Sequence, residues 1–467
     1  MNNKSTFALY FGNRGFFPES LIAGARKELS GKLAELGHQT IMLDEKATRN
    51  GAVETPAEGK VYADFLEQNK GKFQGVILCL PNFGDENGAI AAMKDAGVPI
   101  LIHAYPDEMD QMDFASRRDA FCGKFSIMDV FTQYGIAFTA LTPHTVHPSD
   151  CRFAENIAVF DGVCKVVKGM KRMTVGAVGA RTTAFKTIRF DELTLQKYGI
   201  TTETLDLSEV IFRTGQLNTD TDAYRARANR LKNYTSWDGV PDESFMNLTK
   251  LSIVLDEIIE EYQLDALALR CWLELEKTLN ISPCVLLSEL NDRGFPAACE
   301  LDVCNAIPML ALRLAGGNPA ACLDWNNNYA DDDNKCILFH CGPVPQSMMT
   351  AKGRVIDHPM FAKSLGAGCG FGCNIGRIAP TPFTFASSIT VDGKLKFYLG
   401  EGEFTDDRIP EEFFGCAGVA HIDGLQEKLN KIGHAGYRHH VAVAPGLTRR
   451  AIQEAFMRYL NYEIMDI

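Results

Sequence analysis

Apolar and polar residues alternate along the first 150 residues with the periods of buried strands and amphipathic helices. Strands are predicted at 6–13, 38–44, 75–86 and 98–108, and helices at 18–37 and 88–97. Strands that alternate with helices are typical of a parallel sheet covered by helices on both faces. Ligands bind at the carboxyl ends of such strands, where GNRGFF, PNFGDE and HAYPDE are expected to lie.

A second strand–helix series follows a long apolar helix predicted at 150–170. Its strands are predicted at 171–180, 201–207 and 264–271, with helices around 219–262 and another helix that begins near Cys304. The glycines of VGAVGA do not complete the G-x-G-x-x-G pattern, so a dinucleotide site is poorly supported. We therefore predict a second α/β domain of about the same size.

After about residue 320 glycine, proline and short alternating strands dominate. Segments 335–342, 381–404 and 439–445 are predicted strands, and VDGKL carries the Asp-Gly pair of a tight hairpin. A helix at 448–462 closes the chain. The predicted fold class is α/β, with two Rossmann-like parallel-sheet domains at 1–168 and 169–318 and a mostly β domain at 319–467.

Composition narrows the class of protein. Of the 467 residues 46% are hydrophobic and 23% charged, as in ordinary globular proteins, and the net charge is −12. This charge argues against nucleic acid or an anionic membrane as the main partner, and no apolar run is long enough to span a bilayer. The apolar N-terminal segment is interpreted as a strand and not as a signal peptide. The 14 cysteines are interpreted as reduced thiols of a cytoplasmic protein, and the spacing of Cys369 and Cys373 fits no standard zinc site.

Several ionisable residues lie at the edges of apolar segments in the last third of the chain. They are Glu300, Asp324, His340 and the pair His439–His440. Each has an ordinary alternative: a first-turn helix acid, a turn residue, a core histidine or a solvated strand end. Carboxylates and imidazoles that recur at equivalent positions favour a shared site instead, because lone ionisable groups are costly beside apolar segments.

Oxygen ligands with one or two imidazoles suit Mn²⁺ or Mg²⁺ better than zinc. Such an ion polarises a carbonyl group, and a carboxylate beside it acts as general base and acid. These groups are the ones that aldose–ketose isomerisation through a cis-enediol requires.

The chain also resembles the L-fucose isomerase and L-arabinose isomerase superfamily along nearly its whole length. The matching segments are, in order, GNRGFF, LPNFGDE, VGAVGARTTAFKTIRFDE, AACELD, CLDWNNN, LFHCG, PTPFTFASSI, LGEGEF and YRHHVAVAPG. The resemblance implies two Rossmann-like domains and a C-terminal β domain, with Mn²⁺ as the usual metal and Mg²⁺ or Co²⁺ as alternatives. It also implies a homotrimer or homohexamer whose active sites borrow residues from a neighbouring subunit.

Residue by residue, Glu300 resembles the family's metal-binding acid/base glutamate and Asp324 its second metal carboxylate and proton-transfer partner. His440 resembles the C-terminal metal histidine. His340 resembles a metal ligand of the arabinose branch only, so its role stays open. The catalytic residues implied by the resemblance are thus Glu300 and Asp324.

The matching segments do not identify which sugar is the substrate. The residues expected to bind it are Arg14, Asn82, Arg181, Arg377, Arg438 and His439, all within the matching segments. In this family the first domain lies near a neighbour's active site, where Arg14 would suit an anionic sugar. Relatives that act on sulfonated hexoses make sulfoquinovose the leading expectation, with L-fucose or L-arabinose as neutral alternatives and a solvated surface role for Arg14 as the ordinary one.

The sequence leaves two other functions open. A catalytically inactive sugar-binding protein on the same fold is the main alternative, and the presence of both carboxylates with the histidine argues against it. A metallohydrolase is less well supported, because no compact ligand motif such as H-E-x-x-H is present.

Overall fold

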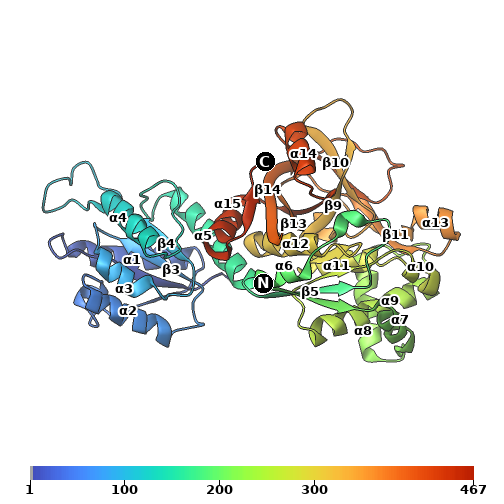
Figure 1. The fold of residues 1–467 in the computed structure, drawn as a ribbon, viewed down its shortest axis with the longest axis horizontal. Coiled ribbons are helices and arrows are strands. Elements are labelled where there is room, and N and C mark those ends of the chain that lie inside the picture. Colours follow the sequence, from blue (N-terminus) through green and yellow to red (C-terminus); the bar gives the residue numbers. More distant parts are fainter. Residues whose placement is uncertain (1–3) are drawn as a thin grey trace. The chain divides into compact units, whose positions relative to one another are not determined.

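The computed structural model describes residues 4–467, which form two compact units (Figure 1). The first unit comprises residues 4–168 and Glu454–Asn461, and the second comprises Gly169–Gln453 and Tyr462–Ile467. The predicted fold class is confirmed, because two four-stranded parallel sheets are followed by a largely antiparallel nine-stranded sheet. The division into three domains stays a prediction.

The first unit is built on a parallel sheet in the order β2-β1-β3-β4. Its strands are β1 (Phe7–Phe11), β2 (Thr40–Met42), β3 (Gly75–Leu80) and β4 (Ile100–Ala104). Its helices are α1 (Ser20–Glu35), α2 (Pro56–Gln68), α3 (Glu86–Met93), α4 (Ala120–Gln133) and most of α5 (Cys151–Met170), with the 3₁₀ turn η1 (Arg49–Gly51). Every residue of β1, β3 and β4 is buried, as expected for strands covered on both faces.

The second unit begins with another parallel sheet, in the order β6-β5-β7-β8. Its strands are β5 (Met173–Val178), β6 (Ile200–Leu205), β7 (Ala266–Leu269) and β8 (Ala297–Cys299). The helical segments between and after them are η2 (Lys186–Ile188), α6 (Glu192–Lys197), α7 (Leu207–Gln216), α8 (Asp222–Tyr234), α9 (Asp242–Glu261), α10 (Glu274–Leu279), α11 (Cys284–Asp292) and α12 (Val303–Gly316).

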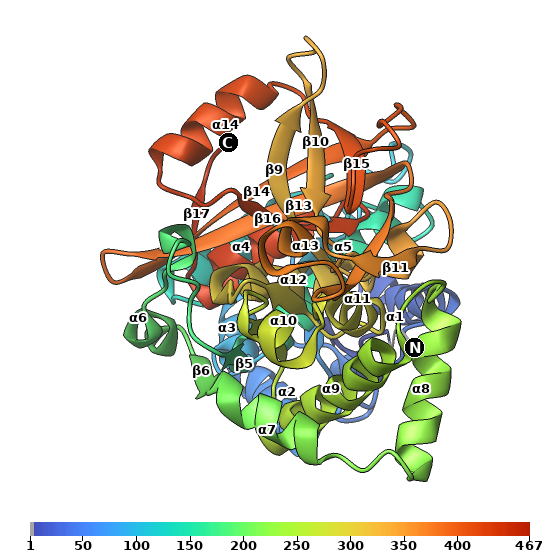
Figure 2. The ribbon, with the colours of Figure 1, turned by 90° about the vertical axis from the view of Figure 1, so that its right-hand side faces the viewer.

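The rest of the second unit is a β barrel. Six strands pair in the order β15-β10-β9-β16-β13-β14, and a pairing of β14 with β15 closes the ring (Figure 2). Its strands and the strands that extend it are β9 (Ala321–Asn328), β10 (Lys335–His340), β11 (Arg354–Asp357), β12 (Phe371–Arg377), β13 (Thr381–Val391), β14 (Lys394–Phe404), β15 (Cys416–His421), β16 (His440–Pro445) and β17 (Glu463–Met465). The helical segments are η3 (Gln346–Met348), α13 (Pro359–Leu365), α14 (Leu425–His434) and α15 (Arg449–Glu454). The π-helix η4 (Ala455–Leu460), which follows α15, belongs to the first unit.

Local sequence explains several of these elements. The predicted hairpin joins β13 to β14 through Asp392 and Gly393, both with positive φ, as the Asp-Gly pair requires. Thr55 caps α2 in a reciprocal capping box with Glu58. None of the helices within residues 4–467 is both long enough and apolar enough to cross a membrane. All cysteines of the described chain are free thiols.

Candidate active site and metal centre

Glu300 follows the edge strand β8 in a turn of unusual backbone conformation. Glu300 and Leu301 have φ values of 61° and 66°, a left-handed conformation that costs free energy for residues with bulky side chains. Asp302 comes next and caps α12, because its carboxylate accepts from the backbone N–H of Asn305. This turn carries the Glu300 side chain into the interior, where the residue is only 5% exposed.

Asp324 and His440 are placed by the pairing of barrel strands. Asp324 lies in β9 directly opposite His440 in β16, and opposite Phe339 of β10 on its other side. The Nε2 atom of His440 lies 3.3 Å from Asp324 Oδ1 and 3.2 Å from Glu300 Oε2. Residues from a parallel-sheet turn and from two barrel strands therefore meet at one point.

The possible ligand atoms that converge there have no hydrogen-bond partner. Glu300 Oε2, Asp324 Oδ1, His340 Nε2 and His440 Nε2 are buried and lack a hydrogen-bond partner among residues 4–467. Ligand atoms of Glu300, His340 and His440 lie within 4.8 Å of one another, as do those of Asp324, His439 and His440. Buried polar atoms are normally paired. Two carboxylates and an imidazole without partners fit a divalent cation that prefers oxygen and nitrogen ligands.

Asp302, together with Arg438, determines which nitrogen of His440 faces this point. Asp302 Oδ2 lies 2.8 Å from His440 Nδ1, and its other oxygen is bonded to the buried Arg438 guanidinium. Although burial opposes it, the positive charge of Arg438 and the hydrogen bond from His440 lower the pKa of Asp302. Because an ionised carboxylate only accepts, Nδ1 carries the hydrogen and Nε2 is free to bind a metal. Sequence reasoning missed Asp302, although it stands in the matching segment AACELD.

In His340 the two ring nitrogens have the opposite roles to those in His440. Its Nδ1 accepts a hydrogen bond of 2.9 Å from the backbone N–H of Cys341, so the neutral ring carries its hydrogen on Nε2. An Nε2–H group donates to a carboxylate and does not ligate a metal. Burial lowers the pKa of His340, but in the metal-free protein Cys341 and Asp324 outweigh it and raise this pKa to about 9. A cation held by Asp324 would offset this effect and favour the neutral ring.

The electrostatic balance of the site favours bound cations or protons. Burial raises the pKa of Asp324 above its ordinary value. Burial alone would lower the pKa of His440, but Asp302, Glu300 and Asp324 raise it well above the ordinary value. Without metal, His440 thus holds a proton that a divalent ion must displace.

The other predicted sugar-binding residues of this unit differ in their surroundings. His439 lies 3.6 Å from Asp324 through its Nε2 atom and stacks on Phe185, with 43% of its side chain exposed. Arg181 bonds to the carbonyl groups of Thr182 and Thr183, and Arg377 to those of Gly376, Pro410 and Phe413. Arg438 is bonded to Asp302. The sugar-binding roles of all these residues stay predictions.

Arg14 and Asn82 belong to the first unit. Arg14 Nε donates to Gly84 O, its guanidinium lies 4.2 Å from the centre of the Phe83 ring, and Nη2 lies 3.5 Å from Glu86. Asn82 is buried and bonds to Asn13 and to the backbone N–H of Gly84. The structure thus brings these two residues together at the carboxyl ends of β1 and β3.

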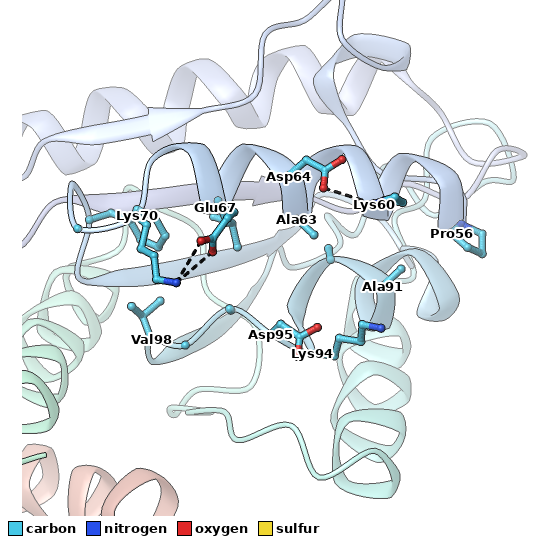
Figure 3. Close-up of a pocket in the computed structure, with 16 residues that line it drawn as sticks. Pro56, Lys60, Ala63, Asp64, Glu67, Lys70, Ala91, Lys94, Asp95 and Val98 are labelled. Carbon is cyan, nitrogen blue, oxygen red and sulfur yellow. Dashed lines mark hydrogen bonds and ion pairs between the residues drawn. The ribbon is translucent and has the colours of Figure 1, made fainter.

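A cleft of about 550 Å³ lies elsewhere in the first unit, between α2 and the end of α3 (Figure 3). Its rim carries ion pairs between Lys60 and Asp64 and between Lys70 and Glu67. None of the predicted site residues lines it.

Comparison with known proteins gives the chain a family. The sequence-family model of the fucose/sulfoquinovose isomerase N-terminal domain matches residues 8–171. The sequence-family model of the L-fucose isomerase C-terminal domain matches residues 338–467. The chain belongs to the fucose/sulfoquinovose isomerase family. Family membership makes it an aldose–ketose isomerase, the class predicted from the carboxylates and imidazoles.

Individual relatives carry related names. Proteins named sulfoquinovose isomerase from Priestia aryabhattai and Priestia megaterium are each 26% identical to this isomerase over 404 residues, covering 85% of the chain and 87% of the relative. A third protein of that name, from Alkalicoccus urumqiensis, is 22% identical over 323 residues, covering 69% of the chain and 71% of the relative. A solute-binding protein from Burkholderia multivorans aligns over 59% of this chain and 82% of its own, with 9% identity and a TM-score of 0.18, too low to support a shared fold.

Proposed function

We propose that this isomerase uses a divalent metal ion to convert an anionic aldohexose, sulfoquinovose, into the ketose sulfofructose. The convergence of three unpaired ligand atoms, Glu300 Oε2, Asp324 Oδ1 and His440 Nε2, carries the proposal of a metal centre. The names of the relatives support the substrate. Mn²⁺ is the proposed ion because the donor set is hard, with Mg²⁺ or Co²⁺ as alternatives.

The ligands in this proposal are Glu300, Asp324 and His440. His340 is placed beside the ion and not on it, because its Nδ1 atom accepts from the backbone and its Nε2 atom carries hydrogen. Held by these three side chains, the ion would supply a Lewis acid that polarises the carbonyl group of the open-chain sugar. His439, partly exposed beside Asp324, is the residue that we propose contacts the sugar.

The two carboxylates then divide the proton transfers of a cis-enediol pathway. Glu300 removes the proton from C2 of the aldose and returns it to C1 of the enediol, which yields the ketose. Asp324 moves a proton between the oxygens on C1 and C2, a role that suits a carboxyl group whose pKa burial has raised. The left-handed turn positions Glu300, and the pairing of β9 with β16 positions Asp324.

Turnover with and without metal tests the proposal. The protein is stripped with a chelator, and sulfoquinovose is added with and without Mn²⁺ while both sugars are followed by NMR. Turnover that depends on Mn²⁺ is expected, and it should be lost in Glu300→Ala, Asp324→Ala and His440→Ala. Full turnover by chelated protein would contradict the metal assignment.

We also propose that the active enzyme is a cytoplasmic homotrimer or homohexamer. The support is the resemblance of the matching segments to this family, in which neighbouring subunits complete one another's active sites. Light scattering coupled to size-exclusion chromatography gives the mass of the assembly, and a 51.5 kDa monomer with full activity would contradict the proposal.

A further inference from the structure

A second group of buried polar atoms without partners lies in the same unit as the metal centre. Trp272 Nε1, Glu276 Oε2 and both ring nitrogens of His358 have no hydrogen-bond partner among residues 4–467. Glu276 and His358 are 0% exposed. Each such atom costs free energy unless water or a ligand satisfies it, and native proteins contain few of them.

The three side chains come from separate segments and are linked through shared neighbours. Trp272 precedes α10, Glu276 lies in α10, and His358 precedes α13. The ring of Phe361 packs against both Trp272 and His358, with centroid distances of 5.7 and 4.2 Å.

Ser282 and Gly370 connect the other side of the group. Ser282 Oγ donates to Glu276 Oε1 at 3.1 Å. A methyl group on Gly370 would lie 3.2 Å from His358 Cβ and 3.4 Å from Ser282 Oγ. These contacts link the three side chains into one cluster, which we call the donor recess and define by Trp272, Glu276 and His358.

Two chains of contacts lead from the donor recess to the metal centre. Phe185 lies between Trp272 and His439, with ring centroids 5.0 Å and 6.1 Å away. On the other side Cys284, two residues after Ser282, packs in one cluster with Cys341, whose Sγ atom lies 3.3 Å from His340 Nδ1. By the first route two residues, Phe185 and His439, separate the recess from the proposed ligand Asp324.

The atoms of the donor recess are suited to giving hydrogen bonds. Indole Nε1 only donates, and a neutral imidazole always has one N–H group. Burial raises the pKa of Glu276 to about 8, so its carboxyl group keeps a proton near neutral pH. Since Ser282 occupies Oε1, that proton belongs on the unpaired Oε2 atom. A partner rich in acceptors and without hydrogens to donate would accept one hydrogen bond from each of the three side chains, whereas the second ring nitrogen of a neutral His358 is an acceptor and needs another partner.

We propose that Trp272, Glu276 and His358 bind the sulfonate group at the far end of the sugar whose C1 and C2 lie at the metal centre. A sulfonate offers three acceptor oxygens and no hydrogen. Buried neutral donors stabilise such an anion without a buried countercharge. This inference rests on the proposed function, because it assumes that the metal centre holds the reacting end.

The test compares two sugars that differ only in the sulfonate. Sulfoquinovose and its unsulfonated counterpart, 6-deoxyglucose, are assayed with the Mn²⁺-loaded enzyme and with Trp272→Phe and His358→Phe, which remove the donors but keep aromatic rings. Each variant is expected to raise the KM for sulfoquinovose about tenfold or more and to leave that for 6-deoxyglucose within about threefold. Trp237→Phe is the matched control, because its indole N–H is bonded to Leu231 O within the fold.

Binding to the wild-type protein gives a second measurement that needs no variant. The sugar alcohols of both compounds cannot isomerise, and calorimetry should find the sulfonated one bound at least about tenfold more tightly. Equal affinity would overturn the inference. Variants that turn over both sugars equally less well would also overturn it. So would variants with unchanged selectivity, which would show that the recess holds only ordered water.

The two proposals fail in different ways. Turnover of 6-deoxyglucose without preference for sulfoquinovose would overturn the donor recess and leave the isomerase intact. If neither sugar is turned over, the proposed substrate is wrong, and the two sugar alcohols still decide whether the recess recognises a sulfonate.

Discussion

The Nδ1 atom of His440 lies 2.8 Å from the Oδ2 atom of Asp302, and both side chains are buried. This contact fixes the hydrogen of His440 on Nδ1 and turns Nε2 toward Glu300 and Asp324. Carboxylates in this position orient ligand histidines and increase their basicity.

Asp302→Asn should therefore weaken Mn²⁺ binding by about 10- to 100-fold. The amide can present its NH₂ group to Nδ1 and favour the wrong tautomer, and Arg438 loses its buried countercharge. Calorimetric titration of the chelated protein with Mn²⁺ measures the effect, and excess Mn²⁺ should restore part of the activity. Asp206→Asn is the control, because Asp206 caps α7 at an exposed position of the same unit. An unchanged affinity in Asp302→Asn would contradict the role of this contact.

The two histidines near the carboxylates should differ in their importance for the metal. His440→Gln is expected to weaken Mn²⁺ binding by about 100-fold or more, since it removes a ligand. His340→Gln should change the affinity by less than about threefold, because His340 Nδ1 accepts from Cys341 N–H and Nε2 is not free. Equal losses in both variants would make His340 a ligand as well.

Metal affinity should rise with pH. The pKa of His440 in the metal-free protein is raised well above its ordinary value, so His440 is protonated at neutral pH and Mn²⁺ has to displace this proton. If one proton is released for each ion bound, the dissociation constant should fall about tenfold for each pH unit of increase below that pKa. Titrations at pH 6, 7 and 8 in buffers of different ionisation enthalpy give both the affinity and the proton count. Binding that releases no proton would show that His440 is neutral before the metal arrives.

Isotope labelling separates proton transfer from hydride transfer. Because protein carboxylates exchange protons with the solvent while they transfer them between C2 and C1, the ketose formed in deuterated water is expected to carry deuterium on C1. NMR of the product at low conversion measures the label. Complete absence of deuterium over many turnovers would favour a hydride shift over the enediol pathway.

Glu276→Gln should stabilise the fold at alkaline pH. Burial raises the pKa of Glu276 to about 8, so between its unfolded value of 4.5 and about 8 the unfolded chain binds fewer protons than the folded one. Stability is therefore lost as pH rises through this range, by up to about 3–5 kcal/mol. The glutamine keeps the contact with Ser282 and does not ionise. The gain in melting temperature over wild type should be small at pH 5 and larger at pH 8.

Glu411→Gln is the control for this change, because Glu411 is exposed in the segment between β14 and β15. A gain that is the same at every pH would show that Glu276 does not titrate in this way.

Arg14 provides a separate test of substrate charge. Arg14→Ala is expected to raise the KM for sulfoquinovose far more than that for 6-deoxyglucose, because the sequence-based hypothesis places this guanidinium at the anionic end of a sugar in a neighbouring subunit. Combining it with Trp272→Phe shows whether both residues act on the same group, since effects on a shared partner are not additive. Unchanged KM values in Arg14→Ala would make Arg14 an ordinary surface residue.

Sequence patterns alone predicted the two α/β sheets and the β-rich end of the chain. Strands such as Phe7–Phe11 and Gly75–Leu80 are short apolar runs bounded by glycine or polar turns, and their period is local information. The Asp392–Gly393 hairpin was predictable for the same reason, because turn chemistry depends on adjacent residues. The prediction of Glu300, Asp324 and His440 as one site came from residue type and from the resemblance of their segments to a family.

Tertiary structure alone decided how those residues are used. Asp324 faces His440 because β9 pairs with β16 in one register, and a sequence does not state which strands pair. The difference between His340 and His440 depends on one backbone N–H group and on Asp302, 138 residues away from His440. The donor recess joins Trp272 and Glu276 to His358 across the fold. Desolvation and hydrogen-bond partners set the chemistry of such groups, and both arise only when distant segments pack together.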